Sequence, residues 1–171
     1  WLENVAFDLD AHIAKSKKST LSSAKKWLGF GSDKKSSVSD VTAFAHLSVR
    51  DAMRKFADVK FVLQEYETAH NTYNSVKKDF NHDKAWKHFA GAQEMLGITQ
   101  IFIEDARAVD CRYFDVAINA YMKCNATLYG CRAMLIVTEM LASRGQFKEA
   151  ATFYMKMTHE ESDLRSALLY E

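Results

Sequence analysis

The sequence predicts an all-α protein, a tetratricopeptide-like solenoid of helical hairpins, and three observations support this prediction. The chain of 171 residues contains no proline, the residue that disrupts helix interiors most strongly. Apolar residues recur at helical spacing along most of the chain, and no segment shows the sustained two-residue alternation of a half-buried strand. An aromatic–alanine–tyrosine pattern also occurs three times, which indicates an internal repeat.

Two segments precede the predicted solenoid. Residues 1–14 place apolar side chains at helical spacing, so we expect an amphipathic helix there. Residues 15–41 are rich in lysine and serine and carry a short apolar island, a composition typical of a connector. The chain begins at Trp1 and stops within an expected helix, so we expect it to be a fragment of a longer polypeptide.

Residues 42–171 form the predicted solenoid, truncated at its C-terminal end. The longest expected helix begins near Asp83, a plausible N-cap. It contains Gly91 and Gly97, which each cost about 1 kcal/mol relative to alanine, and a close helix crossing would explain them. The expected helices of this region are 47–63, 66–79, 83–105, 114–125, 128–143, 147–157 and 162 onward.

The repeat pattern consists of an aromatic residue, an alanine three residues later and a tyrosine four residues further on. The second and third alanines lie 33 residues apart, close to the period of about 34 residues in tetratricopeptide repeats. Each hairpin of such a solenoid has an apolar face that its neighbour covers. We therefore expect repeat packing by nine residues: Tyr66, Ala69, Tyr73, Phe114, Ala117, Tyr121, Phe147, Ala150 and Tyr154.

The sequence contains little that indicates chemistry. Of its six histidines, His82 and His88 are the closest to a cluster, and a spacing of six puts them on opposite sides of a helix. We predict no catalytic residue, no metal and no cofactor, and hence a protein that is not an enzyme. Helical hairpins can also clamp a peptide carboxylate, but the expected clamp positions hold Arg54 and Asp58, and Asp58 would repel that group.

The three cysteines, Cys111, Cys124 and Cys131, have spacings that match no metal or redox motif. We expect free thiols in a reducing compartment, and therefore a cytoplasmic protein.

The segment from Lys15 to Lys35 is strongly basic, with seven lysines and one acid. In a helix from Thr20 to Leu28, the apolar residues share one face and the lysines and serines take the other. Tryptophan and lysine suit an anionic membrane surface. We predict membrane binding, and the alternatives are docking on protein, an idle linker or nucleic-acid binding, which no recognition motif supports. The candidate membrane-binding residues are Leu21, Lys25, Lys26, Trp27, Leu28 and Phe30.

Two blocks of the sequence stand out: the stretch "RKFADVKFVLQEYETAHNTYNSVKKDFNHDKAWKHFAGAQEML" from Arg54, and "SDLRSALLYE" at the end. Both resemble blocks of the TRAPP complex subunit 8 family. Between them, "FDVAINAY" and "MLASRGQFKEAATFY" follow in the expected order. Upstream, "SSAKKWLGFG" resembles the lysine-tryptophan segment of the family. The resemblance covers about residues 20–171.

The resemblance implies a scaffold or tethering subunit specific to the TRAPP III assembly. That complex activates a Rab-type GTPase in secretory traffic and autophagy, with the exchange chemistry in its core subunits. The implied partners are other TRAPP subunits, an anionic membrane surface and, indirectly, the Rab-type GTPase, with no nucleic acid. The implied location is peripheral to Golgi and pre-autophagosomal membranes. The alternative is a generic peptide-binding repeat module unrelated to trafficking.

Overall fold

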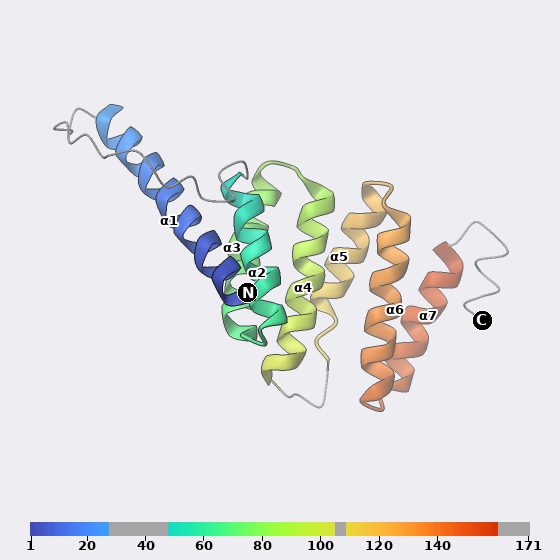
Figure 1. Cartoon of the computed structure of the whole chain (residues 1–171). Coiled ribbons are helices and arrows are strands. Elements are labelled where there is room, and N and C mark those ends of the chain that lie inside the picture. The colour runs from blue at the N-terminus through green and yellow to red at the C-terminus, as the bar shows by residue number, and fades with distance from the viewer. Residues whose placement is uncertain (28–47, 105–108, 161–171) are drawn as a thin grey trace. The chain divides into compact units, whose positions relative to one another are not determined.

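The structure is a computed structural model, and it describes residues 1–27, 48–104 and 109–160. The described part of the chain contains helices and no strand, so the all-α prediction is confirmed (Figure 1). In chain order, the seven described helices are α1 (Leu2–Trp27), α2 (Val49–Val62), α3 (Tyr66–His82), α4 (Trp86–Glu104), α5 (Arg112–Lys123), α6 (Thr127–Ser143) and α7 (Phe147–Glu160).

Helix α1 is longer than the sequence predicted. It continues without a break from Leu2 to Trp27, so the described part of the expected connector is helical. This segment contains neither proline nor glycine before Gly29, and its lysines and alanines are good helix formers. The predicted helix at 20–28 is thus the end of α1, and its last residue, Leu28, lies outside the described residues.

The prediction that Asp83 caps the helix 83–105 is wrong. Helix α3 continues to His82, and Asp83 belongs to the turn that follows it, so α4 begins only at Trp86. The N–H of Phe89 donates to the carbonyl of Ala85 (2.9 Å), which makes Ala85 the residue before the first turn of α4. The helix expected from residue 162 onward lies outside the described residues.

Four helix-to-helix turns share one geometry. Each has three residues, and the middle one has a positive φ: 63° at Gln64, 56° at Lys84, 56° at Asn125 and 75° at Gly145. After each helix, an N–H bonds to a carbonyl five residues back, as Gln146 does to Leu141 (3.0 Å). This is the Schellman arrangement that ends helices. Only Gly145 could be recognised from the sequence as a residue with positive φ, because the other three positions do not hold glycine.

The chain divides into two compact units, residues 1–72 and 73–171. In the first unit, α1 packs on α2 through Ala6, Leu9 and Ile13, which are buried on one face of α1. The apolar face expected for residues 1–14 is therefore the face of α1 that packs on α2.

In the second unit, α4 packs on α5, α5 on α6 and α6 on α7. The closest approach is at Gly97 of α4, where an added Cβ would lie 2.6 Å from Cε2 of Phe114 on α5. The close crossing predicted from the glycines is therefore confirmed at Gly97. The core of this unit is built mainly from the buried faces of α5 and α6, including Phe114, Ile118, Tyr121, Met134, Val137 and Leu141.

Candidate interaction surfaces

The structure buries most of the residues that the repeat pattern singled out. Six of the nine are in the core: Ala69, Tyr73, Phe114, Ala117, Tyr121 and Ala150. Tyr66 and Tyr154 are half-buried, whereas Phe147 has 70% of its surface exposed and does not pack in the described core. Tyr66 and Phe147 are each the first residue of a helix, but Phe114 is the third residue of α5. The three copies therefore share a spacing but not one position relative to the preceding turn.

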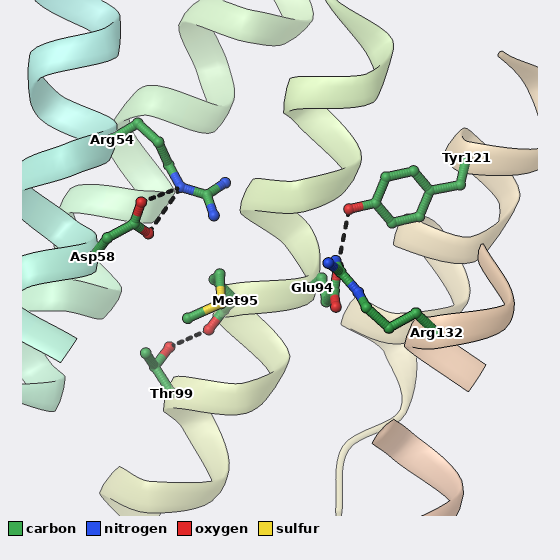
Figure 2. A network of polar contacts seen from close by, with 7 residues as sticks. All are labelled: Arg54, Asp58, Glu94, Met95, Thr99, Tyr121 and Arg132. Atoms are coloured by element: carbon green, nitrogen blue, oxygen red, sulfur yellow. Dashed lines mark hydrogen bonds and ion pairs between the residues drawn. The ribbon is translucent and has the colours of Figure 1, made fainter. Parts of the chain in front are cut away.

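Tyr121 takes part in a polar network that the sequence did not reveal (Figure 2). Its hydroxyl donates to Oε2 of Glu94 on α4 (2.8 Å), and Arg132 on α6 donates to the same oxygen (2.6 Å). The Glu94 carboxylate is almost wholly buried, while the Arg132 side chain is half exposed. Burial lowers the pKa of Arg132, but the hydrogen bond and charge of Glu94 outweigh it and raise that pKa. One buried carboxylate thus joins three helices.

Aromatic and cationic side chains extend this network to the surface. The Tyr129 ring stacks on Tyr121 with centroids 5.7 Å apart. Lys87 Nζ of α4 lies 4.1 Å from the Tyr129 centroid, and the Arg132 guanidinium lies 5.3 Å from it. The starts of α4 and α6 are therefore neighbours, and their side chains are held in fixed positions.

The opposite end of the second unit is joined by hydrogen bonds to the main chain. The N–H of Val109 donates to Oε1 of Gln146 (2.8 Å), and Arg144 donates to the carbonyl of Ile101 (3.3 Å). Next to Val109, Arg112 donates to the Asp110 carboxylate, with its shortest contact at 2.6 Å. Hydrogen bonds from the Arg112 side chain, then from its backbone, lower the pKa of Asp110.

None of the three cysteines forms a disulfide within the described residues. Burial raises the pKa of Cys111, and the negative charges of Asp115, Asp110 and Glu149 raise it further, so its thiol remains protonated at neutral pH. Within the described ranges, no group of three histidine, cysteine or acidic side chains is placed to hold a metal ion.

On α2, Arg54 and Asp58 form an ion pair (3.0 Å, Figure 2). This pair engages Arg54, the cation at one of the two expected clamp positions.

The predicted membrane-binding residues fall at the end of α1 and beyond it. Leu21, Lys25, Lys26 and Trp27 lie on the last two turns of the helix, and Leu28 and Phe30 are outside the described residues. Before this point, the side chains of Lys15, Lys17 and Lys18 are exposed. None of the described helices is both long enough and apolar enough to cross a membrane.

Consecutive helices joined by short turns define the class: an all-α protein, consistent with a helical solenoid. The chain belongs to the TRAPPC-Trs85 family. The model of that family, described as the ER-Golgi trafficking TRAPP I complex 85 kDa subunit, matches residues 1–145. The family resemblance drawn from the sequence is therefore confirmed.

Two relatives agree with this assignment. The chain is 34% identical over 161 residues to trafficking protein particle complex subunit 8 of Homo sapiens, a match that covers 90% of this chain and 11% of the relative. It is 26% identical over 101 residues to transport protein particle subunit trs85-1 of Schizosaccharomyces pombe, covering 55% of this chain and 15% of that protein. The chain thus spans a small part of each relative. No solved structure matches it significantly.

Proposed function

We propose that this chain is a non-catalytic scaffold segment of a TRAPP assembly, TRAPP III, that supports activation of a Rab-type GTPase in secretory traffic and autophagy. Family membership over residues 1–145 is the observation that carries the proposal. The nucleotide-exchange chemistry belongs in other subunits under this proposal, and the solenoid binds them. The protein then acts in the cytoplasm, at the surface of Golgi and pre-autophagosomal membranes.

The end of α1 is the proposed membrane contact. Burial of α1 on its neighbour ends at Ile13, because the described residues from Ala14 to Lys18 are exposed or half-buried. Trp27 is 14 residues further on, about 20 Å along the helix axis at 1.5 Å per residue. On a helical wheel drawn from the sequence, an apolar arc of about 120° runs from Trp27 to Leu21, and Lys25 and Lys26 lie outside it. Lysines near an anionic surface contribute about 1 kcal/mol each, so this segment is suited to weak, reversible attachment.

Liposome flotation tests the membrane contact. The full-length protein is compared with the variant Trp27→Ser/Leu28→Ser/Phe30→Ser on vesicles with and without anionic lipid. We expect the wild type to float with anionic vesicles and the variant to lose at least half of that binding. Trp1→Ser is the matched control, because Trp1 directly precedes the same helix and is 88% exposed. Equal flotation of the triple variant and the wild type would refute the contact and favour docking of this segment on protein.

Co-purification tests the scaffold role separately. The proposal expects TRAPP core subunits to co-purify with the full-length protein at stoichiometric levels. If the core subunits are absent and the protein instead binds extended peptides, the generic peptide-binding module is the better description.

A further inference from the structure

Exposed apolar side chains gather at the starts of α4 and α6. Trp86 is 45% exposed and Leu128 is 78% exposed, and the Tyr129 ring is also open to solvent. The contact between Lys87 and Tyr129 (4.1 Å) joins the two helix starts. We call the surface made by Trp86, Lys87, Leu128, Tyr129 and Arg132 the 86/128 surface.

The turns that frame the 86/128 surface are basic. Residues 82–88 and 121–132 together contain four lysines or arginines and one acid, Asp83. Lys84, Lys87 and Lys123 are exposed, and none of them forms an ion pair with another residue of the described ranges. Asp83 contacts its neighbour His82 (3.0 Å). The three lysines are therefore available to carboxylates of a partner.

Contacts with underlying residues hold the side chains of the 86/128 surface in fixed positions. Glu94 fixes Arg132, Tyr121 stacks under Tyr129, and Trp86 packs edge-on against Phe89 with centroids 6.3 Å apart. A surface fixed before binding loses little side-chain entropy when a partner arrives. Tryptophan, tyrosine and arginine are also the residues that most often carry the binding energy of protein interfaces.

We infer that the 86/128 surface docks on an acidic protein surface of another subunit of the assembly, so this inference rests on the proposed function. Carboxylates of the partner pair with Lys84, Lys87 and Lys123, and an apolar side chain of the partner covers Trp86 and Leu128. Charge complementarity selects the acidic partner. A protein fits better than a lipid surface, because Trp86 and Tyr129 are held by ring contacts and fixed side chains complement a fixed partner.

The test uses the full-length protein reconstituted with TRAPP subunits. Zero-length carbodiimide cross-linking, which joins lysines to carboxylates in direct contact, is expected to link Lys84, Lys87 or Lys123 to acids of one subunit. The charge reversal Lys84→Glu/Lys87→Glu/Lys123→Glu, and separately Leu128→Ser, are expected to weaken binding of that subunit at least tenfold. The matched control is Lys55→Glu/Lys78→Glu/Lys148→Glu, which makes the same charge change at three other exposed lysines and leaves binding unchanged.

Each other outcome overturns the inference. If Lys84→Glu/Lys87→Glu/Lys123→Glu and Leu128→Ser both bind the subunits like the wild type, and the three lysines form no cross-links, the surface docks on no subunit. If Lys84→Glu/Lys87→Glu/Lys123→Glu loses binding to anionic liposomes but still binds the subunits, the surface contacts lipid instead. A wild-type protein that fails to assemble with TRAPP subunits refutes the proposed function, and the inference fails with it; assembly of the wild type separates the two failures.

Discussion

The two ends of the second unit use the same helix-turn geometry but different chemistry. At one end, the turns at Lys84 and Asn125 lead into the 86/128 surface, where aromatic rings and cations meet. At the other end, which we call the 109/146 end, side-chain hydrogen bonds reach the main chain at Val109 and Ile101.

Charge distinguishes the two ends more clearly than exposed apolar area does. Phe102 and Phe147 are exposed at the 109/146 end, just as Trp86 and Leu128 are at the other. The segments 101–112 and 140–149, however, contain four basic and four acidic residues, against four and one around the 86/128 surface. The two ends therefore share exposed apolar side chains but differ in charge, and only the 86/128 surface has the excess of basic residues that the proposed acidic partner requires.

The largest expected effect comes from breaking the network beneath the 86/128 surface. Arg132→Met leaves the buried Glu94 carboxylate with Tyr121 as its hydrogen-bond donor. Removing one member of a buried ion pair costs about 3–5 kcal/mol, and because Arg132 is half exposed we expect about 3 kcal/mol. Denaturant unfolding at neutral pH measures this loss.

A double substitution is the control for that prediction. Glu94→Leu/Arg132→Met removes both charges, so it should be less destabilising than Arg132→Met alone. If the double variant is the less stable of the two, the network stabilises by packing rather than by its charges.

Much of the fold was predictable because helices are encoded by local sequence patterns. Periodicity and the absence of proline predicted the ranges of α2, α5, α6 and α7 to within a few residues. The lysines and serines of residues 15–27 suggested a connector by composition, but they are also compatible with a helix, and the structure has α1 there. The sequence predicted a break between helices at Gln64, but it put Lys84 and Asn125 inside expected helices, because a positive φ is expected at glycine and neither residue is glycine.

The site was less predictable, because its contacts join residues far apart in the sequence. Glu94 lies in a helix that is apolar almost all round, and its partner Arg132 is 38 residues away on another helix. No local pattern pairs them. The repeat pattern found Tyr121 as a packing residue, but its hydroxyl bond to Glu94 depends on how α4 and α5 cross. The predicted membrane-binding residues stay a prediction, since their side chains lie outside the described residues.

The second-largest expected effect comes from removing the hydrogen bond between Val109 and Gln146 at the 109/146 end. Gln146→Ala removes the acceptor of the Val109 N–H, which is buried, and an unsatisfied buried group costs about 1–3 kcal/mol. We expect a loss of about 2 kcal/mol in unfolding free energy. Gln146→Glu keeps an acceptor oxygen at the same position and should lose less. Equal losses in the two variants would contradict a role for the hydrogen bond.

Substitutions at the positive-φ residues of two equivalent turns should change the unfolding free energy by less than the two changes above. Gly145→Ala places a Cβ at φ 75° with no neighbouring atom within 4 Å, so only backbone strain opposes it, about 1–2 kcal/mol. Lys84→Gly relieves the same strain at φ 56° and should stabilise the chain by up to about 1 kcal/mol. Thermal unfolding measures both changes: the melting temperature should fall in Gly145→Ala and rise in Lys84→Gly. Two changes of the same sign would mean that the turns are not equivalent.

The smallest effect is the pH dependence of the 109/146 end. Hydrogen bonds from Arg112 lower the pKa of Asp110 in the folded chain, so Asp110 contributes stability above its unfolded pKa of about 4. That contribution is lost as the pH falls through the lower folded value. The wild type should therefore lose more stability than Asp110→Asn between pH 5 and pH 2, as denaturant unfolding at several pH values would measure. Parallel pH profiles would show that the Asp110–Arg112 pair adds no stability, and the 109/146 end would then depend on its hydrogen bonds to the main chain alone.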